Sequence, residues 1–222
     1  MAGGFGTRLR PLTNNLPKPM VPMVNRPMME HIIELLKKNS ITDLTALLYF
    51  QPEMISERLG DGSAFAVKLG YTTLTVDLGT AGAVGSAMRR LEGDETTLII
   101  SGDVLTDIDL NKAVQFHKEK GSAATLALKS VENPLEFGIV VTDSDGRVER
   151  FLEKPSWSQV FSDTINTGVY VIEPYAVSAY GDGVMYGPVR SRKTYKGITE
   201  REASEALAEV ERDGALCGLL QQ

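Results

Sequence analysis

The sequence is poor in cysteine and histidine, and it carries no excess of basic charge. It has one cysteine, Cys217, and two histidines in 222 residues. A single cysteine excludes an internal disulfide and any metal site built from several cysteines, and this usage fits a reducing cytoplasm. The 23 basic residues are outnumbered by 29 acidic ones, which gives a net charge of −6. We therefore expect no nucleic-acid partner, and any bound anion must be held by a local basic cluster.

Long hydrophobic runs are also missing. No apolar stretch approaches the roughly 20 residues that a membrane-spanning helix needs, and the first residues lack the apolar core of a signal peptide. We therefore expect a cytoplasmic protein with no membrane partner. The hydrophobic share of 42% and the charged share of 23% are ordinary for a globular protein. The length suits one α/β domain, with or without a short appendage.

Helical and strand-like patterns alternate up to about residue 130. Apolar residues at helical spacing predict helices, and short apolar or alternating runs predict strands. Helices are expected at 24–38, 53–59, 83–91 and 110–120, strands at 43–50, 71–76, 96–101 and 123–128, and a glycine-rich turn, "LGTAGAV", at 78–84. This order with short links is typical of an α/β fold with a doubly wound, mostly parallel Rossmann-like sheet and helices on both faces.

Beyond Val131 the pattern changes. Strand-like runs at 139–142, 148–153 and 165–172, with the turn "DSDG" after the first, predict a β-meander at the side of the sheet. From about Gly187 the sequence is basic and non-periodic, and one amphipathic helix with a capping box is expected at 199–212. We expect a domain over residues 1–186 and a divergent tail over 187–222.

The stretch "AGGFGTRLRPLTNNLPKP" at residues 2–19 has the composition of a phosphate-binding loop. Gly3, Gly4 and Gly6 would let the backbone pass close to a triphosphate with its N–H groups toward it. Arg8 can fork onto phosphate oxygens, and Lys18 is held stiffly between two prolines. The third glycine of the dinucleotide fingerprint and the Gly-Lys-Ser/Thr of a Walker loop are both absent. Taken alone, these residues also suit a glycine-rich turn with solvated basic side chains.

The run "TTLIISGD" at 96–103 predicts a buried strand that ends in an aspartate. Asp103 would then lie at the carboxyl end of the strand, where open α/β sheets bind their ligands. A carboxylate oxygen beside phosphates suits Mg²⁺. The alternative is that Asp103 merely caps the turn.

Three short motifs in the second half carry polar residues at strand ends. "FLEKPS" at 151–156 offers Glu153 for sugar hydroxyls and Lys154 for a sugar phosphate, although an ordinary edge-strand ion pair is equally compatible. "INTGVYVIEP" at 165–174 offers Asn166 and Thr167 as sugar-hydroxyl partners, or simply a polar strand start. "EFGIV" at 136–140 adds Gly138, where a glycine permits close ligand approach.

Taken together and in this order, the motifs GxGTRLxPLT, KP, LGTAG, SGD, EFG, EKP and NTG resemble those of the sugar-phosphate nucleotidyltransferases. The resemblance runs from about Ala2 to Pro174, and its first motif is specific. Within that family, the segment from Asn133 to Pro174 looks most like mannose-1-phosphate guanylyltransferases.

The resemblance implies a Mg²⁺-dependent, in-line attack by a sugar 1-phosphate on the α-phosphate of a nucleoside triphosphate, with release of pyrophosphate. It points to GTP and mannose 1-phosphate as substrates. The alternatives are dTTP or ATP with glucose 1-phosphate, and a catalytically impaired subunit that only binds nucleotide sugar. A homo-oligomer is compatible with the family. Because the attacking phosphate is already ionised, no general base is needed, and His31 and His117 are expected to be structural.

The matching motifs imply catalytic roles for Arg8 and Lys18 and a metal-binding role for Asp103. The nucleotide contacts that it implies are Gly3, Gly4, Gly6, Thr7, Gly79 and Gly82. The sugar-phosphate contacts that it implies are Gly138, Glu153, Lys154, Asn166 and Thr167.

The chain departs from the family's pattern at both ends. In the family the loop follows a short central strand, whereas here only Met1 precedes it, so we expect that strand to be missing. After Tyr186 the pattern breaks, and a second metal aspartate of the family has no counterpart. We expect the loss of a strand and of a carboxylate to weaken folding and metal binding.

Overall fold

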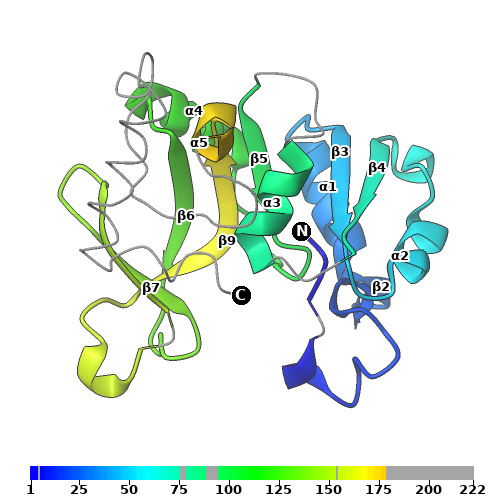
Figure 1. Ribbon diagram of the computed structural model, residues 1–222, viewed down its shortest axis with the longest axis horizontal. Helices are drawn as coiled ribbons and strands as arrows, with labels where there is room; N and C mark the ends of the chain where they lie inside the picture. The colour runs from blue at the N-terminus through cyan, green and yellow to red at the C-terminus, as the bar shows by residue number, and fades with distance from the viewer. Residues whose placement is uncertain (5, 76–78, 89–94, 154, 179–222) are drawn as a thin grey trace. The chain divides into compact units, whose positions relative to one another are not determined.

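The computed structural model describes residues 1–4, 6–75, 79–88, 95–153 and 155–178. The chain divides into two compact units (Figure 1). Unit 1 comprises Met1–Leu78 and Ile100–Ala113, and unit 2 comprises Gly79–Ile99 and Val114–Gln222. The predicted boundary near residue 186, the tail after it and the helix predicted at 199–212 lie outside the described residues.

Unit 1 is built on a parallel pair of strands, β3 (Asp43–Leu48) and β4 (Lys68–Thr73), which pair residue by residue along their whole length. Figure 1 shows them side by side. Helix α2 (Pro52–Leu59) and the 3-10 turn η3 (Ser63–Phe65) connect them. This is the strand–helix–strand order that the sequence predicts, with β4 beginning three residues before the predicted strand at 71–76.

Helix α1 (Met28–Lys38) turns one apolar face into unit 1. Its buried apolar side chains recur at helical spacing and are Met28, Met29, Ile32, Ile33 and Leu36. Lys37 and Lys38 occupy the last turn, where basic side chains interact favourably with the helix dipole. The prediction of a helix at 24–38 is right from Met28 onward and wrong before it.

The residues before α1 form a small antiparallel hairpin, β1 (Pro22–Met23) and β2 (Arg26–Pro27). Val24 and Asn25 make its turn with φ of 51° and 62°, and two successive left-handed residues are typical of a two-residue hairpin turn. Pro27 directly precedes the helix, where a missing N–H does not interrupt the backbone bonds. Residues 22–27 therefore form a hairpin that leads into α1 and are not the first turn of the helix.

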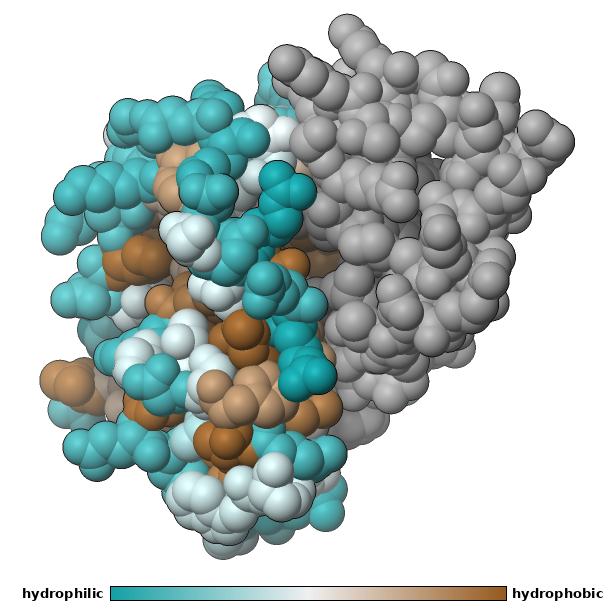
Figure 2. Space-filling model, turned by 90° about the vertical axis from the view of Figure 1, so that its left-hand side faces the viewer, coloured by the Kyte–Doolittle hydropathy of each residue, from teal (hydrophilic) through white to brown (hydrophobic). Residues whose placement is uncertain are grey.

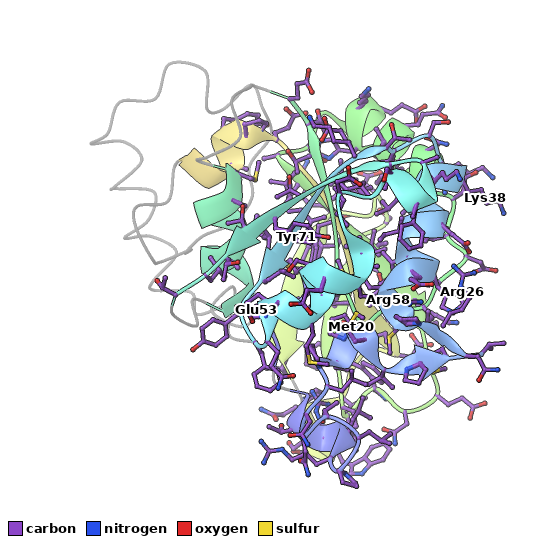
Figure 3. The ribbon with its side chains drawn as sticks, turned by 90° about the vertical axis from the view of Figure 1, so that its right-hand side faces the viewer. Met20, Arg26, Lys38, Glu53, Arg58 and Tyr71 are labelled. Carbon is purple, nitrogen blue, oxygen red and sulfur yellow. The ribbon has the colours of Figure 1, made fainter. Side chains whose placement is uncertain are left out.

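A buried carboxylate joins three elements of unit 1. Glu30 of α1 is 4% exposed and accepts hydrogen bonds from Arg26 of β2 at 3.2 Å and from Arg58 of α2 at 2.9 Å. Arg26 also donates to Glu34 at 2.8 Å. Figure 3 shows Arg26 and Arg58 close together beside α1. The two arginines offset the negative charge of the Glu30 carboxylate, whose burial without a partner would cost free energy.

The first two residues of the chain pair with strands on both sides within unit 1. Ala2 forms a parallel bridge with Leu48, and its N–H donates to the Leu47 carbonyl at 2.8 Å. On the other side, the Met1 amino group donates to the Ile100 carbonyl at 2.7 Å, and the Gly102 N–H donates to the Met1 carbonyl at 2.5 Å. The glycine-rich loop thus starts from a short stretch of extended pairing, although the sequence offers only Met1 before it.

Unit 2 contains β5 (Thr97–Ile100), β6 (Ala124–Ser130), β7 (Gly138–Thr142), β8 (Val148–Glu153) and β9 (Thr164–Ile172). Only the last residue of β5 belongs to unit 1. The strand order is β5-β9-β7-β8, and β6 also pairs with β9. Strands β7 and β8 form the predicted hairpin around the turn Asp143–Gly146, where Gly146 has φ of 78°.

One strand of unit 2, β6, pairs differently from the expectation of a mostly parallel sheet with a β-meander at its side. The pairs β6–β9, β7–β8 and β7–β9 are all antiparallel, whereas β3–β4 of unit 1 is parallel. The sequence places β6 after a helix, which suggested one more parallel crossover. Its partner is instead the late strand β9, and a pattern of local periodicity carries no information on such a distant pairing.

Unit 2 also contains the helices α3 (Gly79–Met88) and α5 (Pro174–Ser178). Helix α4 (Leu110–Lys120) begins in unit 1 and ends in unit 2. The prediction of a glycine-rich turn at 78–84 is wrong for residues 79–84, which lie in α3. None of the described helices is both long and apolar enough to cross a membrane.

A buried polar network crosses unit 2. His117 of α4 is 1% exposed, and its Nε2 and Nδ1 lie 3.3 Å from Glu173 and 2.8 Å from Thr125. Thr96 donates a further hydrogen bond to Glu173 at 2.9 Å. Burial lowers the pKa of His117 below its ordinary 6.5, against the opposing effect of Glu173. His31 instead lies 2.9 Å from the Met23 carbonyl in unit 1.

The surface of unit 2 is mixed. Among the described residues of unit 2, the exposed large apolar side chains are Phe116, Phe137, Trp157 and Phe161. Figure 2 shows hydrophobic patches separated by hydrophilic side chains on the face that it displays. The Arg150 guanidinium lies 4.7 Å from the centroid of the Phe161 ring and partly covers that ring.

Candidate active site

The glycine-rich loop of unit 1 is closed by a tight turn after Gly6. Gly6 has φ of 60°, the left-handed region that glycine adopts without strain. Its carbonyl accepts from the Leu9 N–H at 2.9 Å, which forms the 3-10 turn η1 (Thr7–Leu9), and from the Thr13 hydroxyl at 2.7 Å. Thr7 and Arg8 are exposed on this turn. The turn therefore presents the predicted arginine on the surface of the loop.

The three loop glycines differ in why they are needed. A Cβ on Gly6 would lie 3.0 Å from a Thr13 carbon and 3.1 Å from Lys18 Cβ, and one on Gly3 would lie 3.2 Å from Tyr49 Cβ. A Cβ on Gly4 would meet nothing within 4 Å. A side chain would thus be crowded at positions 3 and 6, whereas the described residues leave room for one at position 4.

Lys18 and Asp103 form an ion pair although they are 85 residues apart in sequence. Lys18 starts the 3-10 turn η2 (Lys18–Met20) between the buried prolines Pro17 and Pro19. Asp103 follows the end of β5, and its Oδ2 accepts from the Lys18 ammonium. Both side chains keep about a third of their surface exposed, 33% and 32%. The structure therefore brings together the lysine and the carboxylate that the sequence motifs single out.

Gly102 fixes where Asp103 lies, and sequence reasoning assigned it no role. It is buried, and a Cβ there would lie 2.7 Å from the Met1 carbonyl oxygen and 3.1 Å from Ala2 Cβ. Only glycine lets the end of β5 approach residues 1 and 2 this closely. The Asp103 carboxylate is near enough to the Met1 amino group to oppose the effect of burial, which lowers the pKa of that group to about 6. The glycine of the SGD motif is the sequence feature that could have indicated this role.

Four of the five residues predicted to bind the sugar phosphate belong to strands β7, β8 and β9 of unit 2. Gly138 is buried at the start of β7, opposite Glu153 at the end of β8. The Glu153 side chain and Lys154 lie outside the described residues. Asn166 donates to the Tyr170 hydroxyl at 2.7 Å and accepts from the Gly168 N–H at 3.1 Å.

A bulge in β9 orients Asn166 and Thr167. Leu126 of β6 faces Tyr170 and Leu128 faces Asn166, so β9 carries extra residues there. Gly168 takes φ of 76°, and the Thr167 hydroxyl donates to the Ala127 carbonyl at 2.6 Å. A bulge redirects side chains locally, and it explains the NTG sequence better than a plain polar strand start does. Gly79 and Gly82 lie in α3, and their predicted contact with a base stays a prediction.

The described residues fit a divalent cation only in part. Among them, no group of three or more His, Cys, Asp and Glu could enclose a metal ion. Asp103 offers one carboxylate, which is partly exposed and paired with the Lys18 ammonium group. Mg²⁺ is commonly held by one or two carboxylates together with substrate phosphates, so Asp103 suits a cation that arrives with a triphosphate.

The family model "Nucleotidyl transferase" matches residues 1–213. The chain belongs to this family. It is 38% identical over 179 residues to a probable mannose-1-phosphate guanylyltransferase of Oryza sativa, covering 78% of this chain and 49% of that protein. It is 36% identical over 198 residues to a UTP–glucose-1-phosphate uridylyltransferase of Synechocystis, covering 84% and 51%. This nucleotidyl transferase chain thus spans about half the length of these relatives.

Solved structures confirm the α/β fold of the nucleotidyl transferase chain. A Bacillus anthracis protein assigned as a glucose-1-phosphate thymidylyltransferase, in complex with sucrose, aligns with a TM-score of 0.72 and 28% identity over 80% of this chain and 71% of that one. HddC of Yersinia pseudotuberculosis aligns with a TM-score of 0.72 and 21% identity over 94% and 96%. The second likeness is evidence for the fold alone.

Proposed function

We propose that this chain transfers a nucleotidyl group from a nucleoside triphosphate to a sugar 1-phosphate. The observation that carries the proposal is the Lys18–Asp103 pair beside the glycine-rich loop of a nucleotidyl transferase chain. Gly6 and η1 place Arg8 on the same loop. Two basic side chains and a carboxylate are the groups needed to hold a triphosphate with a divalent cation.

In this reaction an oxygen of the sugar 1-phosphate attacks the α-phosphorus, and the bond from that phosphorus to the β-phosphate oxygen breaks. Pyrophosphate leaves with the electron pair. The attacking phosphate is ionised, so no side chain must take a proton. Arg8 and Lys18 hold the triphosphate and stabilise the charge that develops on the transferred group, while the backbone of Gly3, Gly4, Gly6 and Thr7 supports the phosphates. In our proposal Gly79 and Gly82 lie near the base.

Asp103 would hold Mg²⁺, which supplies charge neutralisation at the phosphates. Gly138, Glu153, Lys154, Asn166 and Thr167 would bind the sugar phosphate. The Thr167 hydroxyl, the Asn166 amide and the Glu153 carboxylate provide donors and acceptors for sugar hydroxyls, and Lys154 provides a positive charge. A cytoplasmic location, where nucleoside triphosphates are made and used, belongs to the same proposal, and a homo-oligomeric state is compatible with it.

GTP and mannose 1-phosphate are the substrates that we propose. The relative in rice and one in Mycobacterium tuberculosis, 36% identical over 183 residues, are both named as mannose-1-phosphate guanylyltransferases. The second candidate is glucose 1-phosphate with UTP or dTTP, favoured by the Synechocystis relative and the Bacillus anthracis neighbour. A subunit that binds nucleotide sugar without turnover is the remaining alternative.

A pyrophosphate-release assay separates these candidates. The chain is incubated with Mg²⁺, one nucleoside triphosphate and either mannose or glucose 1-phosphate, and its folding is checked by circular dichroism. We expect the highest kcat/KM with GTP and mannose 1-phosphate. Higher kcat/KM with UTP or dTTP and glucose 1-phosphate would reassign the substrates, and a folded chain without any turnover would favour the binding subunit.

Arg8 and Arg10 provide a matched pair for the same assay. Both are exposed arginines of one loop, so they contribute equally to the general positive charge. Arg8→Ala should lower kcat/KM by about a hundredfold or more, as expected for loss of a group that stabilises the transition state. Arg10→Ala should change it by less than about threefold. Equal effects of the two substitutions would contradict the role given to Arg8.

A further inference from the structure

Thr13 is a polar residue buried beneath the glycine-rich loop. Its side chain is 1% exposed, and its hydroxyl donates to the Gly6 carbonyl at 2.7 Å. The same carbonyl accepts from the Leu9 N–H at 2.9 Å. A buried hydroxyl without a partner would be costly, so opening this bond inside the folded loop is unfavourable. The hydroxyl therefore links Thr13 to the left-handed turn at Gly6.

Packing reinforces this bond. Gly6 has φ of 60°, and a Cβ placed on it would lie 3.0 Å from the Thr13 methyl carbon and 3.1 Å from Lys18 Cβ. The methyl group of Thr13 and the stem of Lys18 therefore both pack against the Gly6 backbone. Arg8 follows Gly6 by two residues, and Lys18 is paired with Asp103. Gly6 is thus close to Arg8 in sequence and to Lys18 in space, and Thr13 contacts its backbone.

We propose that Thr13 is a positioning residue that holds the glycine-rich loop closed. Its hydroxyl and methyl group keep Gly6 in the left-handed conformation, which fixes the backbone from which Arg8 and Lys18 project. What the closed loop binds rests on the proposed function, whereas the closure itself does not. A loop held in its binding geometry loses less entropy when a triphosphate arrives, so closure favours both binding and turnover.

Two substitutions distinguish this role from simple filling of the core. Thr13→Val keeps the shape of the side chain and removes the hydroxyl. Thr13→Ser keeps the hydroxyl and removes the methyl group. If Thr13 only fills space, valine serves as well as threonine and serine is the worse substitute. If the hydroxyl holds the loop, serine is the better substitute.

The sequence offers a direct readout of loop closure. Arg10, Lys18 and Arg26 are each followed by proline, and trypsin cuts such bonds poorly. Between residues 1 and 36, Arg8–Leu9 is therefore the bond that trypsin cuts readily. It lies in η1, directly after Gly6 and Thr7. Cleavage of a native protein at such a bond follows the population of the opened segment when opening is fast.

We expect native Thr13→Val to be cut at Arg8–Leu9 about tenfold faster than the wild type, the factor that corresponds to one lost buried hydrogen bond. Thr13→Ser should stay within about threefold of the wild type. The fragment that begins at Leu9 is quantified by mass spectrometry without added nucleotide. Equal cleavage of wild type and Thr13→Val would overturn the proposal. Urea unfolding of each variant separates local opening from global loss of stability.

Two glycine substitutions test the same closure without changing Thr13. Gly6→Ala introduces a Cβ against Thr13 and Lys18 at a positive φ, whereas Gly4→Ala meets nothing within 4 Å. We expect faster cleavage at Arg8–Leu9 for Gly6→Ala and an unchanged rate for Gly4→Ala. Equal rates in the two would contradict the packing argument, and this pair remains informative if Thr13→Val does not fold.

Kinetics then connect closure to the proposed reaction. Thr13→Val should lower kcat/KM for the triphosphate, largely through KM, and Thr13→Ser should restore it. Faster cleavage of Thr13→Val in a chain that turns over no substrate would support loop closure and refute the proposed function. Full turnover of Thr13→Val with unchanged cleavage would refute the role of Thr13 and leave the proposed function intact.

Discussion

At the scale of single residues, Lys18 and Asp103 neutralise each other within unit 1. The sequence motifs predict that Lys18 binds the triphosphate and that Asp103 binds the metal. In the structure the two side chains form an ion pair. The ammonium group therefore competes with a divalent cation for the Asp103 carboxylate. A triphosphate that attracts Lys18 would free the carboxylate, so cation and nucleotide should bind more tightly together than separately.

Replacing Lys18 should expose this competition without any reaction. Lys18→Met removes the ammonium group and should raise the affinity of the nucleotide-free protein for Mn²⁺ about tenfold, because a neighbouring positive charge is lost. Free Mn²⁺ is measured by electron paramagnetic resonance. Lys68→Met, which removes another lysine paired with an aspartate, should leave the affinity unchanged. An unchanged affinity in Lys18→Met would contradict the competition.

Residues with a distinctive motif could be found from the sequence, and residues that act through contacts could not. Gly6, Arg8, Lys18 and Asp103 belong to motifs whose residue types match phosphate and metal chemistry. Thr13 lies in the same first motif, but its importance depends on burial and on a bond to a carbonyl seven residues earlier. Gly102 depends on a close approach by Met1. No pattern in one sequence reveals either contact.

At the scale of secondary-structure elements, Glu30 links α1 to β2 and α2. Its side chain is 6% exposed, whereas that of Glu34, which also pairs with Arg26, is 52% exposed. Glu30→Gln should lower the free energy of unfolding by about 1–3 kcal/mol, because charged hydrogen bonds to a buried group are lost. Glu34→Gln should cost less than about 0.5 kcal/mol. Urea denaturation measures both, and equal costs would contradict the account.

The His117 network should make stability depend on pH. Because burial lowers the pKa of His117 below 6.5, the unfolded chain takes up a proton at this residue at a higher pH than the folded protein does. This contribution to the free energy of unfolding is complete above the unfolded pKa and declines as pH falls below it. We expect His117→Gln to lose that part of the pH dependence.

His31 is the matched control, since it is the second of the two histidines and lies partly exposed in unit 1. Urea unfolding is compared at about pH 7.5 and pH 5.5 for the wild type and both variants, a range that brackets the ordinary histidine pKa. His31→Gln should keep the decline. If His117→Gln declines as steeply as the wild type, the buried imidazole is not its source.

Elements with strong local patterns were predictable. Helix α4 and strand β8 have the bounds that periodicity predicts, and β3, β5 and β9 differ only at their ends. The hairpin β1–β2 was missed because each of its strands has only two residues, too few to show an alternating pattern. The antiparallel pairing of β6 was missed because β9 lies some 40 residues later in the chain. Partners that far apart are selected by tertiary packing and leave no local signal.

At the scale of the whole molecule, family membership rests on the match over residues 1–213 and the fold on solved neighbours. Each unit carries part of the proposed chemistry. Unit 1 holds the loop, Lys18 and Asp103, and unit 2 holds the residues proposed for the sugar phosphate. The relatives are about twice as long as the matched region, so the activity of this chain has to be measured on the chain itself.

The central claim is that a sugar 1-phosphate oxygen attacks the α-phosphate of a triphosphate. We would give the purified chain unlabelled GTP, Mg²⁺ and mannose 1-phosphate carrying ¹⁸O at the non-bridging phosphate oxygens, and analyse the products by mass spectrometry. We expect GDP-mannose that retains all of the label and pyrophosphate that contains none. Label in pyrophosphate, or GMP formed in place of a nucleotide sugar, would contradict it.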